Sequence, residues 1–197
     1  MESGEPLRPT GRRRRPPWPR QERSTWQGDC FWGMQAYLDK LPGVIETVVG
    51  YANGTTEAPT YEEVCSGTTH HAETVHVTYN PKVIGLPLLL AAYLDVIDPT
   101  SVNKQGEDEG EQYRTGIWWT DDANEAVVTA ALEQAASALG EDAGPVVVQV
   151  GTVQGFWPAE EYHQKYLAKD PCGYCHVNLG DADRFVAEHQ AEFGLAE

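Results

Sequence analysis

A cysteine followed by two large aromatic residues is the stretch of this chain that most clearly could do chemistry. It reads GDCFWG over residues 28–33, and the residues after it predict a helix. If Cys30 lies in the first turn of that helix, its sulfur faces unpaired backbone N–H groups and the positive end of the helix dipole. Both favour the thiolate, which is the reactive form of cysteine. Phe31 and Trp32 would line an apolar pocket beside the sulfur. The same stretch fits a buried structural cysteine equally well, so other residues must decide.

A nucleophilic cysteine needs a proton donor and polar groups that hold its substrate. Glu73 stands at the start of a predicted strand, where a half-buried carboxyl has a raised pKa and can donate a proton at neutral pH; an ordinary exposed glutamate also fits there. Tyr61 and Tyr113 adjoin turn-rich loops, from which their hydroxyls can reach a polar atom, although single tyrosines more often pack in a core. Asp108 lies in an acidic run over 107–111 that is by default a solvated loop.

The second cysteine motif, CGYCH over residues 172–176, is compatible with several kinds of chemistry. Haem attachment, a dithiol of thioredoxin-like spacing and half of a zinc site all use such spacing. Haem attachment needs export, and no secretory signal is visible. A thioredoxin-like dithiol opens a helix after a strand, whereas this motif follows a predicted helix. Zinc would need a second set of ligands, for which the candidates are Cys65, His70, His71 and His76. A thiol on a flexible C-terminal segment also suits the resolution of an oxidised Cys30 as a disulfide.

Hydrophobic periodicity predicts the elements that must position these residues. Strands are expected over 24–29, 44–51, 73–79, 113–120 and 145–150, and helices over 31–41, 86–97, 121–139, 159–168 and 182–193. The strand over 73–79 alternates in a way that predicts one buried face. From residue 24 the order is strand, helix, strand, strand, helix, strand, which is the split βαβ pattern of ferredoxin-like sandwiches. We therefore expect an α+β fold with a mixed sheet and an irregular C-terminal segment.

Composition and charge narrow the class of protein. With 197 residues, 41% of them apolar, the chain can bury the core of one domain. Its formal charge of −16 is unevenly spread, because residues 1–23 carry seven arginines while the rest is strongly acidic. An acidic body argues against nucleic acid as the main partner. We expect residues 1–23 to be a disordered basic tail and residues 24–197 to form a single domain.

No stretch is long and apolar enough to cross a bilayer, so we expect no membrane contact. Since no secretory signal is visible, we expect a cytoplasmic protein whose four cysteines stay reduced. Cysteines in that setting serve catalysis, redox chemistry or metal binding more often than disulfide scaffolds.

With these residues in view, the chain resembles the peptide methionine sulfoxide reductase A family. The resemblance covers about residues 24–180 and depends on short motifs that occur in the same order. They are GDCFWG at 28–33, LPGV at 41–44, VGYA at 49–52, PTYEEVCSG at 59–67, HAE at 71–73, DPT at 98–100, NKQG at 103–106, GEQYR at 110–114, AEEYHQ at 159–164 and GYCH at 173–176. Any one of them is weak evidence, whereas the ordered set is specific.

The resemblance implies a thiol reductase that acts on the S epimer of methionine sulfoxide, free or in proteins. It implies that Cys30 attacks the sulfoxide sulfur, and that Phe31 and Trp32 hold the methyl group of the substrate. It also implies that Glu73 protonates the sulfoxide oxygen, because oxygen leaves the sulfur only if it is protonated as charge builds. The further residues implied at the site are Tyr61 and Tyr113, which assist the proton transfer, and Asp108, which helps to build the site.

The resemblance further implies how the enzyme is recycled. Cys175, in the C-terminal segment 171–197, condenses with the sulfenic acid of Cys30 to a disulfide, which thioredoxin reduces. Cys172 is an additional thiol that could compete with or relay from Cys175. Asp29 departs from the glycine that the family usually has before the nucleophile, and its charge would disfavour the thiolate unless it points away. We expect a monomer that needs no cofactor or metal.

Overall fold

One sheet of six strands organises the computed structural model, which describes residues 22–27, 30–140 and 143–195. The strand order is β7-β6-β1-β3-β2-β8. The strands are β1 Glu22–Gln27, β2 Val44–Ala52, β3 Ala72–Tyr79, β6 Gly116–Trp119, β7 Gln149–Thr152 and β8 Phe156–Pro158. All neighbours in the sheet are antiparallel except β6 and β7, which are parallel, so the sheet is mixed as expected. The tail over 1–23 and Asp29 lie outside the described residues, apart from the first two residues of β1.

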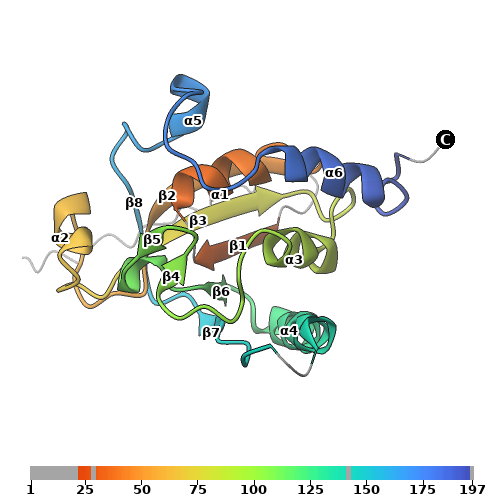
Figure 1. The fold of residues 1–197 in the computed structure, drawn as a ribbon, viewed down its shortest axis with the longest axis horizontal. Coiled ribbons are helices and arrows are strands. Elements are labelled where there is room, and N and C mark those ends of the chain that lie inside the picture. The colour runs from red at the N-terminus through yellow and green to blue at the C-terminus, as the bar shows by residue number, and fades with distance from the viewer. Residues whose placement is uncertain (1–21, 28–29, 141–142, 196–197) are drawn as a thin grey trace, which may run out of the picture.

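Helices cover the sheet and connect its strands. They are α1 Phe31–Leu38, α2 Tyr61–Cys65, α3 Leu86–Leu94, α4 Glu125–Leu139, α5 Tyr166–Lys169 and α6 Gly180–Glu188. Figure 1 shows α1 running along β2 and β3 with α6 beside it, and α3 packs against α4. The apolar sides of these helices meet the strands in one hydrophobic core, which includes Met34, Leu38, Val75 and Leu89. Two single 3₁₀ turns, Glu111–Tyr113 and Asp122–Asn124, complete the helical elements of the described chain.

The central strand β3 is buried on both faces, although its alternating sequence predicted one buried face. Thr74 and Thr78 belong to the predicted polar face, yet both are buried. Thr74 satisfies its hydroxyl by donating to the carbonyl of Ala72 at 2.9 Å. On the same face the ring of His76 packs on Phe156, with 5.4 Å between ring centroids. The second face is buried because β3 lies between β1 and β2 in the centre of the sheet. Its polar residues tolerate burial because most of them are threonines, whose hydroxyls can bond to nearby backbone groups.

The end of the sheet where β1 finishes and α1 begins gathers the loops that carry the candidate site residues. The segment between α3 and β6 contains the two-stranded hairpin β4 Lys104–Gln105 and β5 Asp108–Glu109, followed by the turn that holds Tyr113. This hairpin lies at that end of the sheet, and α2 projects beyond it on the same side (Figure 1). The predicted strand over 113–120 begins later, at Gly116, so Tyr113 belongs to the loop and not to the sheet.

The segment after α4 differs most from the sequence-based expectation. The predicted strand over 145–150 is displaced to β7, which is largely exposed. Within the predicted helix over 159–168, residues 159–165 are irregular or turn, and helix begins only at Tyr166, with α5; strand β8 ends just before this segment, at Pro158. The side-chain amide of Gln164 explains this, because it bonds both the N–H and the carbonyl of Val49 on β2, at 3.0 and 2.8 Å. Lys165 then adopts a left-handed conformation, with φ 52°, which interrupts any helix.

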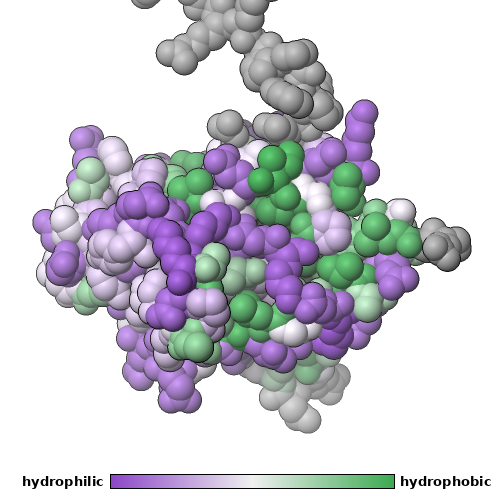
Figure 2. Space-filling view, turned by 90° about the horizontal axis from the view of Figure 1, so that it is seen from above, coloured by the Kyte–Doolittle hydropathy of each residue, from purple (hydrophilic) through white to green (hydrophobic). Residues whose placement is uncertain are grey.

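The surface shows no large apolar area on the face seen in Figure 2, where hydrophilic side chains separate the apolar ones. None of the described helices is long and apolar enough to span a membrane.

Candidate active site

Cys30 is buried and lies at the N-cap of α1, one residue before the first turn in which it was expected. Only 6% of the residue is exposed. Its carbonyl accepts the N–H groups of Gly33 and Met34 at 3.1 and 3.3 Å, which begins the helix. Its side chain makes no capping hydrogen bond to the first turn. The thiol is therefore located at the positive end of the helix dipole without occupying the backbone N–H groups there.

The carboxylate of Glu73 occupies one of those N–H groups. Its Oε2 accepts the backbone N–H of Phe31 at 3.1 Å, and only 2% of Glu73 is exposed. Because Phe31 directly follows Cys30, the acid on β3 and the thiol before α1 belong to one buried site. Two negative charges in such a space disfavour each other, so ionisation of the thiol is favoured when the acid is protonated.

Two tyrosines, Tyr61 and Tyr113, lie close enough to Glu73 for its charge to act on their hydroxyls. Burial raises the pKa of Tyr113, and the charges of Glu73 and Cys30 raise it further. Burial also raises the pKa of Tyr61, helped by its hydrogen bond to Cys65 and by the charge of Glu73. Both phenols therefore keep their protons at neutral pH and remain hydrogen-bond donors.

Asp108 connects the site to the C-terminal segment. Its Oδ2 lies 3.2 Å from Nδ1 of His176, and both side chains are mostly buried. The charge of Asp108 also contributes to the raised pKa of Tyr113, after burial and Glu73. The acidic run over 107–111 therefore is not entirely a solvated loop, because this member turns inward.

Cys175 packs against the first turn of α1. Its Sγ donates to the carbonyl of Val177 at 3.1 Å, and a Cβ placed on Gly33 would lie only 3.1 Å from that sulfur. Cys175 is half-buried, whereas Cys172 is exposed. All four cysteines belong to the described residues, and all are thiols. The structure thus brings Cys175, and not Cys172, against the helix that Cys30 begins.

Phe31 and Trp32 form part of an aromatic cluster. Phe31 is almost fully buried and packs on His163 and Tyr51, with ring centroids 5.0 and 6.0 Å away. Trp32 is partly exposed, and Tyr166 stacks on its indole with centroids 3.9 Å apart. These two rings directly follow Cys30 in the chain, and Tyr166 covers one face of the indole.

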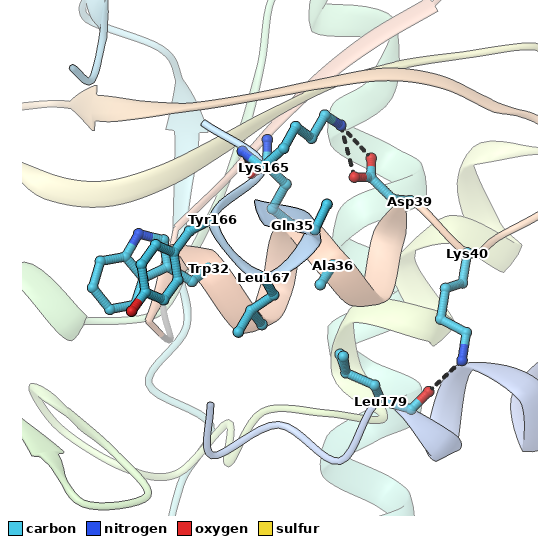
Figure 3. Close-up of a pocket in the computed structure, with 10 residues that line it drawn as sticks. Trp32, Gln35, Ala36, Asp39, Lys40, Lys165, Tyr166, Leu167 and Leu179 are labelled. Carbon is cyan, nitrogen blue, oxygen red and sulfur yellow. Dashed lines mark hydrogen bonds and ion pairs between the residues drawn. The ribbon is translucent and has the colours of Figure 1, made fainter. Parts of the chain in front are cut away.

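A separate cavity of about 240 Å³ lies on the far side of this stack (Figure 3). It runs between α1 and the segment 165–168, with Trp32 and Tyr166 at one end. Near the other end the Lys165 ammonium contacts the Asp39 carboxylate at 2.6 Å. Cys30 does not line this cavity, so it is not the place where the thiol would react.

Two residues near the site, Glu160 and His163, are not predicted from the sequence, where residues 159–164 form only a family motif within a predicted helix. Glu160 accepts the hydroxyl of Tyr51 at 2.8 Å and the backbone N–H of Tyr61 at 3.0 Å. His163 is 1% exposed and accepts the indole N–H of Trp32 at 3.1 Å. Their spacing of three residues after a proline was the only signal in the sequence.

Within the described ranges, no three or more His, Cys, Asp or Glu side chains are grouped so that they could hold a metal ion. The histidines considered as zinc ligands have other contacts: His70 Nδ1 lies 2.9 Å from a carboxylate oxygen of Glu111, and the ring of His71 bonds the carbonyl of Thr56. The region therefore contains a buried thiol, a buried acid bonded to the residue after it, and two tyrosines on which the charge of that acid acts. Such a set can attack a centre that carries an oxygen and protonate that oxygen as it leaves.

Comparison with known proteins gives concordant results. The family model described as "Peptide methionine sulfoxide reductase" matches residues 22–193. A peptide methionine sulfoxide reductase MsrA of Lachnoclostridium phytofermentans is 51% identical over 148 residues, which are 75% of this chain and 87% of the relative. The reduced form of Mxr1 from Saccharomyces cerevisiae is similar in structure, with a TM-score of 0.73 and 36% identity over 79% of this chain and 88% of that one. Mxr1 in complex with Trx2 matches with a TM-score of 0.53 at 24% identity over 74% and 84%.

Proposed function

The chain belongs to the peptide methionine sulfoxide reductase family and is a thiol-dependent enzyme that reduces methionine sulfoxide. We propose which of its residues carry out this reaction and what each of them does. The observation that carries the proposal is the 3.1 Å hydrogen bond from Phe31 N–H to Glu73, since it joins a buried acid to the residue after the buried thiol.

Cys30 is the nucleophile. Its thiolate attacks the sulfur of methionine sulfoxide, and the sulfoxide oxygen moves to the cysteine, which becomes a sulfenic acid. The cysteine sulfur is oxidised by two electrons, the substrate sulfur is reduced by two, and methionine leaves. The helix dipole at the N-cap of α1 supports the thiolate, because it stabilises negative charge at this position.

Glu73 is the acid. In its protonated form it donates to the sulfoxide oxygen while negative charge develops there. Tyr61 and Tyr113 donate hydrogen bonds to the same oxygen, and their raised pKa values, caused first by burial, keep them protonated for this role. Asp108 holds the loop around Tyr113 against His176 and so helps to build the site.

Phe31 and Trp32 bind the methyl group of the substrate. The support is the aromatic cluster next to Cys30, in which Phe31 is fixed from two sides and Trp32 is fixed by Tyr166. Contact with such apolar surfaces removes the methyl group from water and so stabilises the bound substrate. A charged or bulky group would not fit as well.

Cys175 resolves the sulfenic acid. Its thiol attacks the sulfur of Cys30, water leaves, and a disulfide joins the two residues. The support is the contact between Cys175 and Gly33, three residues beyond Cys30. Thioredoxin then reduces the disulfide. The support is that yeast Mxr1, which is similar to this chain, has been solved in complex with Trx2.

Cys172 is an additional thiol in this cycle. It is exposed and three residues from Cys175, so it can attack Cys175 in the disulfide with Cys30. A Cys172–Cys175 disulfide then forms and Cys30 leaves as a thiolate, ready for a second sulfoxide. In this scheme the wild-type enzyme releases up to two methionines before any external reductant acts.

We propose a split βαβ, ferredoxin-like core for this fold, which the order β6-β1-β3-β2 supports because β3 separates β1 from β2. We also propose that residues 24–197 form one catalytic domain that works as a monomer in the cytoplasm. The support for that location is that four cysteines are too few for a disulfide scaffold in a chain of this length.

The assay that tests this function couples thioredoxin, thioredoxin reductase and NADPH to each methionine sulfoxide epimer separately. The wild-type enzyme should consume NADPH with the S epimer, free or in a peptide, and not with the R epimer. Cys30→Ser should be inactive with both. Full activity of Cys30→Ser, or equal activity on both epimers, would refute the proposal.

A further inference from the structure

His163 lies at the centre of the rings that surround the proposed substrate site. Its ring centroid is 5.0 Å from that of Phe31 and 4.6 Å from that of Tyr61. Its Nδ1 accepts the indole N–H of Trp32 at 3.1 Å. One buried imidazole therefore touches both proposed methyl-binding residues and one of the two proposed phenol donors.

The partner of this ring fixes its protonation state. An indole N–H can only donate, so Nδ1 of His163 carries no proton and the ring is neutral with its proton on Nε2. Burial lowers the pKa of His163, while the carboxylates of Glu160 and Glu62 oppose that change. Nε2 lies 3.9 Å from Glu160 Oε2, which is too far for a hydrogen bond.

The segment around His163 is itself held rigidly. Gln164 bonds β2 through both atoms of its side-chain amide, and Lys165 N–H donates to the buried Gln35 on α1 at 2.7 Å. Glu160 bonds the first residue of α2 and the hydroxyl of Tyr51. The imidazole thus projects from a segment that is anchored to both the sheet and α1.

We propose that His163 is a positioning residue of the substrate pocket, which acts by holding the indole of Trp32 in the orientation that receives the methyl group. Tyr166 stacks on the face of the same indole and His163 bonds its edge, so together they fix both the plane and the rotation of the ring. This inference rests on the proposed function, because the pocket it shapes is the one assigned to the substrate methyl. His163 itself has no assigned contact with the reacting atoms.

A positioning role of this kind predicts a specific kinetic signature. Contact between the indole and a methyl group is the same in the bound substrate and in the transition state, so its loss raises KM and leaves kcat unchanged. Loss of one hydrogen bond to a partly buried ring should raise KM by about five- to tenfold. Loss of the acid Glu73 would instead lower kcat.

The experiment is a double-mutant cycle with His163→Phe and Trp32→Phe. For each variant we would measure KM and kcat with the sulfoxide. In the absence of substrate we would also measure the free energy of unfolding in urea. His163→Phe keeps an aromatic ring but removes the acceptor. His163→Asn should retain most of the wild-type KM, because its amide oxygen can take the place of Nδ1. The matched control is Trp118→Phe on β6, whose indole N–H has no hydrogen-bond partner.

We expect His163→Phe to raise KM with kcat within about twofold of wild type, and to add little in the Trp32→Phe background. In the Trp118→Phe background its effect should be undiminished. The proposal is overturned if His163→Phe leaves KM unchanged, or if its effect multiplies fully with that of Trp32→Phe. If His163→Phe does not fold, His163→Asn is compared with His163→Gln instead. Asparagine places its oxygen near the Nδ1 position, whereas glutamine places its oxygen near the Nε2 position. Equal KM values for these two variants would then overturn the proposal.

Failure of the proposed function can be told apart from failure of this inference. The function fails if Cys30→Ser remains active, whatever the His163 variants do. The inference fails if wild type is active, Cys30→Ser is inactive and KM does not respond to loss of the acceptor. The unfolding measurement reports the coupling between His163 and Trp32 independently of activity.

Discussion

At the scale of single residues, the backbone N–H of Phe31 does two things at once. It is one of the unpaired donors at the start of α1, and it binds the carboxyl of Glu73, a residue 42 positions further along the chain. From the sequence, such donors are expected to stabilise the thiolate of Cys30. In the structure the acid has one of them, so that donor is not available to the thiolate. When Glu73 is protonated, the thiolate of Cys30 is the only negative charge of the pair. The proton of Glu73 is then available to the sulfoxide oxygen as negative charge develops there.

Replacement of Glu73 by glutamine tests the acid. Glu73→Gln keeps the size and the hydrogen bond to Phe31 N–H, but it removes the transferable proton. We expect kcat for methionine sulfoxide to fall by about 10²- to 10⁴-fold, the usual scale for a general acid, with a small change in KM. Rapid-quench measurement of the first methionine released checks this. Glu133→Gln, an exposed change on α4, serves as control, and an unchanged first turnover in Glu73→Gln would remove Glu73 from the mechanism.

Two buried histidines should titrate abnormally. Burial lowers the pKa of both His71 and His163 below the ordinary value of 6.5. Each is neutral in the folded protein, so the unfolded chain takes up protons first as the pH falls. Their contribution to the free energy of unfolding is therefore complete above pH 6.5 and is lost progressively below it. NMR titration of the imidazole signals measures this directly, and a midpoint at or above 6.5 for His163 would contradict the assigned neutral state.

At the scale of elements, the contact between α1 and the C-terminal segment sets the geometry of recycling. A Cβ placed on Gly33 would lie 3.1 Å from the thiol of Cys175 and 2.9 Å from Val177. A side chain at position 33 would collide with both. The helix therefore approaches the segment closely because glycine leaves room there, and this closeness brings Cys175 near the start of α1, where Cys30 is.

Gly33→Ala should separate the two steps of the cycle. The added Cβ would lie 2.9 Å from Val177 and 3.1 Å from Cys175 Sγ, so the segment must shift. Alanine favours a helix over glycine by about 1 kcal/mol, so α1 itself is not weakened. We expect release of the first methionine to persist, while disulfide formation slows by about tenfold or more, since small misplacements of reacting groups cost this much.

Thiol counting after a single turnover measures that rate. Gly85→Ala is the matched control, because its added Cβ meets only Pro87, at an ordinary 3.6 Å. Disulfide formation at the wild-type rate in Gly33→Ala would show that the contact does not position Cys175.

The elements that could be predicted from the sequence are those with strong periodicity. Helices α1, α3 and α4 and strands β2 and β3 lie within a few residues of their predicted bounds. The secondary structure predicted for residues 145–169 was wrong, because hydrogen bonds to distant parts of the chain determine the conformation of this segment. The side chain of Gln164 bonds the backbone of Val49, 115 residues away, and no local pattern encodes such a contact.

At the scale of the whole molecule, the site is assembled from segments that are distant in sequence. The indole of Trp32 and the imidazole of His163 are 131 residues apart, yet they share a hydrogen bond. The sequence predicted the chemistry of Cys30, Glu73 and the tyrosines through the order of family motifs. It did not predict which of the six histidines matters, because that depends on which one the fold buries beside the aromatic residues.

Removal of residues 1–21 tests the proposed domain boundary. These residues carry most of the arginines of the basic tail, and β1 begins directly after them, at Glu22. Because no assigned site residue lies among them, we expect the truncated protein to keep kcat/KM within about twofold of the full chain, with the same dependence on thioredoxin. A large loss of activity with an unchanged circular dichroism spectrum would assign those residues a functional role.

The most direct test of the account is to map the cysteines after turnover without reductant in the Cys172→Ser variant. The enzyme is mixed with excess S epimer, the remaining thiols are blocked, and peptides are identified by mass spectrometry while methionine is counted. We predict about one methionine per enzyme molecule and a disulfide between Cys30 and Cys175, with Cys65 blocked as a thiol. A disulfide that excludes Cys30, or release of methionine with Cys30 still a thiol, would contradict the account.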